Sequence, residues 1–379
     1  MSKSTFLEKL LDGAGAEWVP LQKLVKTLTA AAKIQRGKYE TVGDIPVIDQ
    51  GADFIAGYTD KGNKATELGQ YVIFGDHTEH VKYVDFIFAQ GADGLKILQP
   101  ISSNPKYIYY AFQTFYTKEF QYKRHWSKAK DTEIPIPCPE NPEKSLAIQA
   151  EIVRILDTFT ELTAELTAEL TARKKQYNYY RDQLLTFEEG DLEWKTLGEL
   201  AKNLDSKRKP ITAGSREPGE IPYYGASGIV DYVKGFIFDG DYLLVSEDGA
   251  NLLARSTPIA FSIHGKTWVN NHAHVLEFET YAERKYIEYY LSNIDLTPYI
   301  SGAAQPKLNK KNLNSIRIPN PSIEEKKRTV AILDKFDTLT HSISEGLPRE
   351  IELRQKQYEY YRDLLLNFPK PEPQTEIVA

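Results

Sequence analysis

One long stretch of the chain has hydrophobic residues at the spacing of a helix that packs on another helix. From about Ser145 to Phe187 there is no proline or glycine, and the apolar positions are Ile152, Ile155, Phe159, Leu162 and Leu166, continued by Tyr177, Tyr180 and Leu184. Alternating steps of three and four residues place these side chains on one narrow seam. About 42 residues at about 1.5 Å each give a helix of roughly 60 Å. We therefore expect a helical arm with a partner helix of similar length.

The segment from Ile323 to Phe368 is the expected partner, but Gly346 and Pro348 interrupt it. Proline removes a helical donor and clashes with the preceding turn, so a break or kink is expected between about Ser344 and Arg349. Alternatively, Pro348 lies in the first turn of a new helix, where it is tolerated. The residues expected at the helix–helix seam are Ile155, Phe159, Leu162, Leu166, Tyr177, Ile332, Phe336, Leu339, Tyr358 and Tyr361.

The two arms belong to an internal repeat. Residues of the block at 152–163, among them Ile155, Leu156, Asp157, Phe159 and Leu162, recur 177 residues later in the block at 329–340. KQYNYYRDQLL (175–185) recurs 181 residues later as KQYEYYRDLLL (356–366). The second copy therefore holds four more residues between its matched blocks. Weaker matches upstream keep the same order, such as EWVPLQKLVK (17–26) with EWKTLGELAK (193–202). A repeat this long indicates duplicated domains, since solenoid units span about 20–50 residues.

This duplication predicts five segments. They are a first globular domain at 1–144, a helical arm at 145–189, a second globular domain at 190–322, a second arm at 323–368 and a disordered tail at 369–379. Within the domains, strands are expected at 71–76, 84–90, 241–248 and 274–278, helices at 107–115 and 284–291, and turns at 221–228. We predict the α+β class: two similar domains separated by two long arms that form an antiparallel coiled coil with pseudo-twofold symmetry.

The first arm contains TAELTAEL at 163–170, in which leucines recur every four residues. One added TAEL unit would lengthen the helix by about 6 Å and turn its end by about 40°. This segment is interpreted as a ruler between the domains, although a solvated helix with good helical propensity is an equally simple interpretation.

Composition narrows the classes of protein. The chain has 379 residues, 41% hydrophobic and 26% charged, with a net charge of −6 and one cysteine, Cys138. An internal disulfide and a cysteine-rich zinc site are excluded. The apolar runs are far shorter than the roughly 20 residues of a membrane span, and the N-terminus lacks an apolar signal core, so a cytoplasmic protein without membrane contact is expected. The net charge does not by itself indicate nucleic-acid binding.

Catalytic motifs are missing from the sequence. It has no GxxxxGK[ST] loop, no GxGxxG after a strand and no NPP followed by an aromatic residue. DLEWK (191–195) superficially resembles a nuclease motif, but its repeat copy lacks the first Asp and the Lys, so a structural role is favoured. His77 with His80 could share a helix face, and His272 with His274 a strand face, but no ligand pattern accompanies them and no metal site is predicted.

Basic residues gather in loops at matching places of the two repeats. Lys118 to Lys130 contains five Lys or Arg against one Glu, and Gly302 to Arg317 contains four and no acid. Lysine suits phosphates, whereas arginine and amides suit base edges. Solvated surface charges are the simpler alternative. The predicted DNA-contacting residues are Lys123, Arg124, Lys128, Gln305, Lys307, Asn309 and Lys310, with Lys33, Arg36, Lys207, Arg208 and Arg216 as weaker candidates; Gln305 and Asn309 are assigned to bases.

The duplicated layout, IPIPCP and IRIPNP before the arms, the ILDxF starts, the TAEL tetrads and the KQYxYYRDxLL ends together resemble the specificity subunit of a type I restriction–modification enzyme, in particular its IC-like subfamily. The resemblance implies a non-catalytic subunit whose two target recognition domains read a split site on double-stranded DNA, with the helices setting the gap. It also implies two modification subunits that methylate adenine, and restriction/translocase subunits. S-adenosylmethionine and ATP would be bound by those partners, so no cofactor is expected here.

Two other hypotheses remain open at this point. The chain could be a cytoplasmic coiled-coil scaffold without DNA recognition, in which case reversing the charge of the loop clusters would leave its activity unchanged. It could also be a single-chain restriction enzyme, which the missing motifs disfavour.

Overall fold

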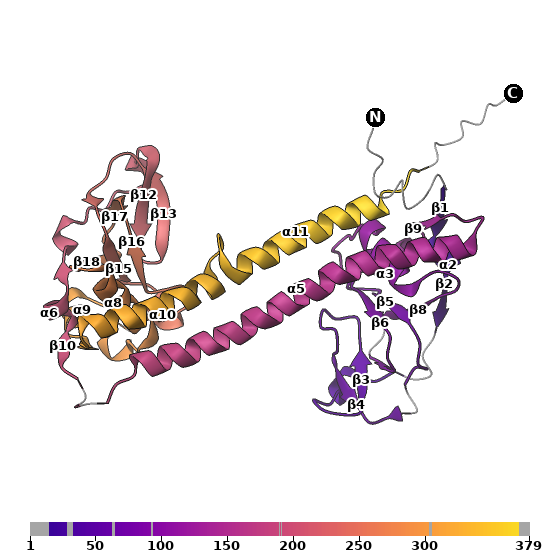
Figure 1. Cartoon of the computed structure of the whole chain (residues 1–379), viewed down its shortest axis with the longest axis horizontal. Coiled ribbons are helices and arrows are strands. Elements are labelled where there is room, and N and C mark those ends of the chain that lie inside the picture. Colours follow the sequence, from indigo (N-terminus) through magenta and orange to yellow (C-terminus); the bar gives the residue numbers. More distant parts are fainter. Residues whose placement is uncertain are drawn as a thin grey trace. The chain divides into compact units, whose positions relative to one another are not determined.

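A computed structural model of the chain describes residues 15–28, 33–62, 65–91, 94–188, 190, 192–302 and 305–370. The chain divides into two compact units, whose elements are labelled in Figure 1. Unit 1 takes Met1–Leu166 and Ile351–Ala379, and unit 2 takes Thr167–Glu350. This division differs from the predicted domain boundaries because part of each helical arm packs on a globular part and belongs to its core.

Unit 1 is built on a four-stranded antiparallel sheet in the order β2 (Val25–Leu28), β8 (Leu95–Pro100), β5 (Tyr71–Gly75) and β6 (Val81–Val84). A smaller sheet has the order β4 (Gly57–Thr59), β3 (Ile45–Ile48) and β7 (Ala89–Gln90), with β3 and β7 parallel. β1 (Ala16–Pro20) pairs with β9 (Glu133–Pro137). The short helices are α2 (Leu21–Leu24), α3 (Pro105–Phe115), α4 (Trp126–Ala129) and the 3-10 turn η1 (Arg36–Lys38).

Unit 2 repeats this plan. Its main sheet has the order β11 (Lys202–Asn203), β18 (Ala273–Glu277), β15 (Tyr242–Ser246) and β16 (Ala260–Ile263). The second sheet has the order β13 (Gly228–Val233), β12 (Pro218–Gly225), β17 (Lys266–Val269) and β14 (Phe238–Asp239), with β12 and β17 parallel. β10 (Trp194–Thr196) pairs with β19 (Arg317–Pro319). The short helices are α6 (Leu197–Leu200), α7 (Asn251–Ala254), α8 (Tyr281–Asn293), α9 (Lys310–Asn314), η3 (Asp205–Lys207), η4 (Ala213–Ser215) and η5 (Thr297–Tyr299).

The shared strand order, including the same parallel pair in the second sheet, confirms the predicted duplication of an α+β domain. In each unit one helix contributes fully buried side chains to the main core: Tyr107 and Phe112 from α3, and Tyr286 and Leu291 from α8. Asn104 caps α3 and Thr280 caps α8 by accepting backbone N–H groups, so both helices start at a defined residue.

The first arm is one helix, α5 (Pro142–Leu185), of 44 residues. It begins three residues earlier than expected because the Asn141 side chain accepts the Lys144 N–H at 3.0 Å and Pro142 occupies the first position. Within unit 1, the Phe159 ring of α5 stacks on Tyr361, with centroids 5.2 Å apart. Within unit 2, the Tyr180 ring of α5 stacks on Phe336, with centroids 5.6 Å apart. Each unit thus has a pair of arm helices with the same aromatic contact. In unit 1 the first arm contributes the phenylalanine and the second arm the tyrosine, and in unit 2 the reverse holds.

The second arm consists of α10 (Ile323–His341) and α11 (Gly346–Leu366). Four residues, 342–345, separate these two helices, which is the number of extra residues in the second repeat. Pro348 lies in the first turn of α11, as the second of the two interpretations expects. Gly346 has φ +76°, a left-handed conformation that favours glycine.

Several local expectations were wrong. The stretch 84–90 is not one strand, since β6 ends at Val84 and β7 begins at Ala89. Most of the expected turn at 221–228 is the end of β12, and only 226–227 form the turn into β13. Of the expected tail, Pro369 accepts a hydrogen bond from the Trp18 indole at 3.1 Å, and residues 371–379 lie outside the described residues, as does the N-terminal segment before residue 15. Among the described helices, none combines the length and apolar character that crossing a membrane needs.

Candidate nucleic-acid interface

In unit 1, the predicted cations lie on α4 and on the loop that leads from α3 to it. Lys123, Arg124 and Lys128 are all exposed. The Glu119 carboxylate is 2.7 Å from the Lys123 ammonium and 3.1 Å from that of Lys128. Hydrogen bonds from these two lysines lower the pKa of Glu119 to about 2. Arg124 forms no ion pair with any described residue, so its charge is available to a ligand.

A buried carboxylate fixes the shape of this loop. Glu79 is 2% exposed and accepts three hydrogen bonds, from the Tyr116 hydroxyl at 2.6 Å, the Phe120 N–H at 2.8 Å and the Glu119 N–H at 2.9 Å. Burial raises the pKa of Glu79, but these hydrogen bonds and the neighbouring His125 lower it overall. The loop is therefore held from inside by an ionised side chain.

In unit 2, the corresponding residues lie in the loop between η5 and α9 and at the first position of α9. Gln305, Lys307 and Lys310 are exposed, and the Lys307 ammonium is 3.2 Å from the Glu247 carboxylate. Asn309 is half-buried and caps α9, because its side-chain oxygen accepts the Asn312 N–H at 3.0 Å. The oxygen of Asn309 thus has a structural role, which its assignment to base contacts did not foresee.

Arg208, a weaker DNA candidate, points into unit 2. Its side chain is 12% exposed, and Nη1 is 2.6 Å from Glu247 Oε2. Beside it, His274 Nδ1 is 2.6 Å from Asp205 Oδ2, and His274 Nε2 is 2.7 Å from the Leu308 carbonyl. Arg208 therefore serves to join three loops that are distant in the sequence.

Three members of this network, Asp205, Glu247 and His274, also have possible metal-ligand atoms within 4.8 Å of one another. The Arg208 guanidinium already balances the two carboxylates. Burial raises the pKa of both acids, but hydrogen bonds from His274 and Arg208 lower them below their ordinary values. The geometry is that of an ion-pair network.

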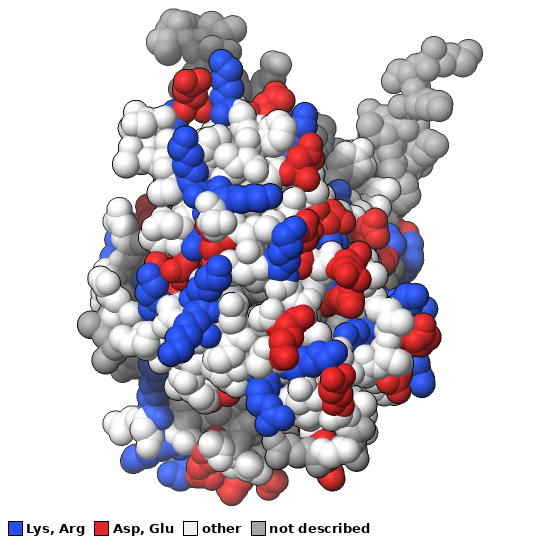
Figure 2. Space-filling view, turned by 90° about the vertical axis from the view of Figure 1, so that its left-hand side faces the viewer, with Lys and Arg blue, Asp and Glu red and all other residues white. Residues whose placement is uncertain are grey.

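The other weaker candidates for DNA contact differ in how exposed their side chains are. Lys33, Arg36 and Lys207 are exposed. Arg216 is internal: its guanidinium is 2.9 Å from Asp231 and lies over the Tyr223 ring at 4.5 Å, so it braces β12 and β13. On the face drawn in Figure 2, blue Lys and Arg side chains are spread over both halves, whereas red acidic ones are more frequent on the right.

The two histidine pairs do not share a site. His77 and His80 lie in the turn after β5 and not on a helix, so the expected common helix face is wrong. His272 precedes β18 and its Nδ1 is 2.9 Å from Asp248, whereas His274 is buried in the ion-pair network.

The seam residues of the arms are partly covered. Tyr177 is buried, and burial is the main cause that raises its pKa to about 12. Tyr358 lies 6.5 Å from Tyr110, centroid to centroid. The half-buried members of the predicted seam are Ile155, Phe159, Leu162, Leu166, Ile332, Phe336, Leu339 and Tyr358, whereas Tyr361 is 39% exposed.

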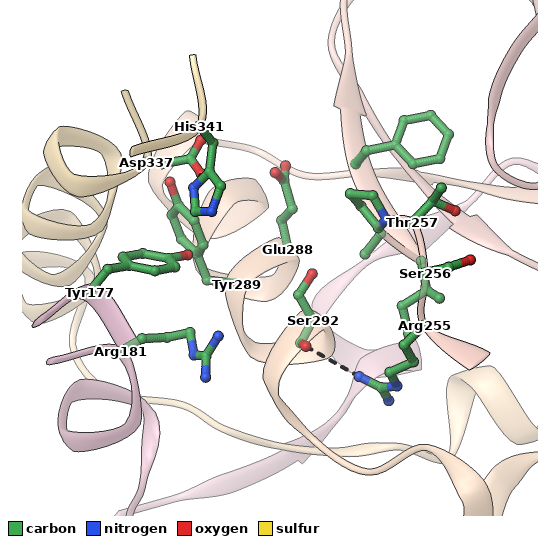
Figure 3. A pocket seen from close by; sticks show the side chains of 14 residues that line it. Tyr177, Arg181, Arg255, Ser256, Thr257, Glu288, Tyr289, Ser292, Asp337 and His341 are labelled. Atoms are coloured by element: carbon green, nitrogen blue, oxygen red, sulfur yellow. Dashed lines mark hydrogen bonds and ion pairs between the residues drawn. The ribbon is translucent and has the colours of Figure 1, made fainter. Parts of the chain in front are cut away.

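Each unit has a pocket at an equivalent place, between its long globular helix, the edge strand of the main sheet and an arm helix. The pocket in unit 2, about 590 Å³, is shown in Figure 3, where Arg255 donates a hydrogen bond to the Ser292 carbonyl at 3.2 Å. The pocket in unit 1, about 390 Å³, is lined by Tyr110 of α3, by β6 and by Asp157, Thr160 and Glu161 of α5. The equivalent tyrosines hold equivalent arm residues: the Tyr110 hydroxyl donates to Asp157 at 2.7 Å and the Tyr289 hydroxyl to Asp334 at 2.6 Å.

Sequence reasoning missed Glu79, and it missed the aromatic residues Phe120 and Tyr122 between the predicted cations. Phe120 is 88% exposed and Tyr122 is 91% exposed. Two large aromatic residues within a basic, proline-free loop were the available signal. Glu79 gave none, because it is 40 residues from the N–H groups it binds.

The chain matches the family model described as the type I restriction modification DNA specificity domain twice, over residues 17–173 and 189–353. It is 44% identical over 404 residues to the EcoR124I/EcoR124II type I restriction enzyme specificity subunit of Escherichia coli, covering 98% of this chain and 99% of that protein. It is 35% identical over 393 residues to the EcoprrI specificity subunit of Escherichia coli, covering 91% and 93%.

The fold has solved counterparts. The S subunit of a type I restriction–modification system from M. genitalium superposes with a TM-score of 0.65 at 18% identity, covering 95% of this chain and 98% of that one. The double family match spans the same duplication that the strand orders reveal. This chain belongs to the specificity subunits of type I restriction–modification enzymes.

Proposed function

We propose that this specificity subunit recognises a bipartite DNA site, with one half-site bound by each unit and the gap between them set by the helical arms. The main support for this proposal is the duplication of the α+β domain. Two units with the same strand order but different surface loops suit two different half-sites. The exposed cations of unit 1 and the exposed Gln305, Lys307 and Lys310 of unit 2 occupy the same connection in each repeat.

In this proposal, phosphates are held by the exposed lysines and base edges are read by Arg124 and Gln305. Arg208, Arg216 and Asn309 are largely engaged by residues of unit 2 and support the loops. They contact DNA at most through polar groups that these hydrogen bonds and ion pairs leave available. The chain itself performs no catalysis. Adenine methylation would be carried out by two modification subunits with S-adenosylmethionine, and cleavage by ATP-dependent restriction subunits, in the cytoplasm.

The docking of two identical partners is supported by a repeated surface on the arms. Tyr179 in unit 2 is 62% exposed and Tyr360 in unit 1 is 64% exposed, and they are equivalent in the repeat. Each packs edge-on against the next tyrosine, at 5.4 Å and 5.3 Å between centroids. Exposed tyrosines are frequent among the residues that dominate protein interfaces. We assign these tyrosine pairs to the modification subunits.

Single-molecule sequencing of methylated adenines tests the function directly. A host that expresses this chain with its modification subunit is expected to carry methylation at a two-part motif with a fixed gap. Charge reversal at Arg124 should change or abolish one half of that motif, and Lys310→Glu should affect the other half. A scaffold without DNA recognition would give no motif, and neither charge reversal would change the methylation pattern.

A further inference from the structure

The loop between α3 and α4 displays an aromatic ring that the described residues of unit 1 leave exposed. Phe120 is 88% exposed, although burying a phenylalanine side chain is favourable. Its φ of +55° is left-handed, which is uncommon for a bulky residue and costs free energy unless the surroundings impose it. Both features mark the position of Phe120 as imposed by the structure around it.

The surroundings do impose it. The buried Glu79 carboxylate accepts the N–H groups of Glu119 and Phe120 together, so the backbone on both sides of the exposed ring is fixed. The Glu119 side chain in turn pairs with Lys123 and Lys128 and closes the base of the loop. The ring is therefore presented by a preorganised support and does not have to be ordered when it binds.

The ring also stands among positive charges. Lys118, Lys123, Arg124 and Lys128 surround it in the sequence, and all but the first were predicted to contact DNA. Tyr122, 91% exposed, stacks on His77 with an interplanar angle of 23° and adds a second aromatic surface to the loop. Proteins that bind the minor groove frequently insert phenylalanine or another apolar side chain between base pairs and partly unstack them.

We propose that Phe120 inserts between two base pairs of the half-site bound by unit 1 and locally unstacks the duplex. The proposal rests on the proposed function, since it takes double-stranded DNA as the ligand of this loop. Lys123 and Lys128 hold the phosphates on either side of the step, and Glu79 is a positioning residue that acts through the loop backbone.

The two half-sites should differ in this respect. In unit 2, the described residues of the equivalent connection, 294–302 and 305–309, contain no strongly exposed large apolar side chain; Tyr299 and Ile300 are half-buried. The distortion is therefore expected in one half-site only.

The experiment uses the full chain in complex with its modification subunits and a duplex that carries its methylation motif. 2-Aminopurine is placed in turn at each position of both half-sites, apart from the adenines that become methylated. The wild-type complex is expected to raise fluorescence at one base step of one half-site. Phe120→Ala should abolish that signal and weaken binding about 5- to 100-fold, the range of base–aromatic contacts. Phe120→Leu should keep most of the signal, because leucine also serves as a wedge.

Ile343→Ala is the matched control, since Ile343 is 83% exposed but lies between α10 and α11; it should leave both readouts unchanged. If DNA binding and 2-aminopurine fluorescence are unchanged in Phe120→Ala, the insertion proposal is wrong. The proposed function still stands in that case, provided that the wild-type complex binds its motif specifically. A wild-type complex that does not discriminate its motif would overturn both. If Phe120→Ala instead weakens assembly with the modification subunits in the absence of DNA, the ring contacts protein and the proposal is wrong.

Discussion

Glu79 is the residue whose charge has the clearest consequence for unit 1. Its carboxylate accepts three hydrogen bonds while 2% exposed, so replacing it by glutamine puts an N–H group where an acceptor is needed. We expect Glu79→Gln to lower the free energy of unfolding by about 2–3 kcal/mol, since hydrogen bonds to charged groups are each worth roughly 1.5–3 kcal/mol. Denaturant unfolding followed by tryptophan fluorescence measures it. Tyr116→Phe, which removes one donor and keeps the ring, should cost less.

The same residue predicts a pH dependence. The pKa of Glu79 is lowered in the folded chain, so its contribution to stability is present above the unfolded value of about 4.3 and is lost as the pH falls toward the folded value. The difference in unfolding free energy between wild type and Glu79→Gln should therefore shrink below about pH 4. A difference that stays constant from pH 7 to pH 3 would show that the lost energy is one of packing and not of charge.

At the scale of the element, Gly346 begins α11 in a conformation that other residues resist. A Cβ at this position would come within 2.3 Å of the Thr338 carbonyl oxygen and within 2.9 Å of that of Leu339, and φ is +76°. We expect Gly346→Ala to destabilise unit 2 by at least about 2 kcal/mol, because left-handed strain alone costs roughly 1–3 kcal/mol. Calorimetric unfolding of the full chain should show one of its transitions lowered.

Two controls separate the causes of this break. Gly214→Ala should be close to neutral, since a Cβ there meets nothing within 4 Å. Pro348→Ala should also have little effect, because a proline in the first helical turn removes no hydrogen bond. If Pro348→Ala joined α10 and α11 into one helix while Gly346→Ala had no effect, proline and not glycine would be the cause of the break.

The arms were the part of the fold that the sequence could predict, and the sites were not. Heptad spacing and the repeat offsets predict the helical arms, because these patterns are local. Gly346 and Pro348 predict a break at about 344–349, and the structure has it slightly earlier, at 342–345. Heptad spacing did not predict the full burial of Leu156. This side chain is buried because it shares the core of unit 1 with α3, and heptad spacing reports only on contacts between the arms. The network of Asp205, Glu247 and His274 joins residues up to 69 positions apart, so only the assembled sheet brings them together.

At the scale of the whole molecule, the repeated tyrosine pairs predict how partners assemble. Since Tyr179 and Tyr360 are equivalent and similarly exposed, each should anchor one copy of the same modification subunit. We expect Tyr179→Ala or Tyr360→Ala to leave a complex with one modification subunit, and the double variant to bind none, as measured by native mass spectrometry. Gln355→Ala, an exposed residue of α11, is the control. Loss of both subunits in either single variant would indicate one shared docking site.

The length of α5 should set the gap between the two half-sites, because this single helix continues from unit 1 into unit 2. One TAEL unit inserted after Leu166 adds about 6 Å and about 40° of rotation, and duplex DNA rises about 3.4 Å per base pair. The unread gap of the methylated motif should therefore grow by one or two base pairs, while the bases of both half-sites stay the same, as methylated-adenine sequencing would report. Glu165→Gln, which keeps the length, should leave the gap unchanged. An insertion that changed the bases read and not their separation would mean that the helix helps to shape the reading surfaces and does not act as their spacer.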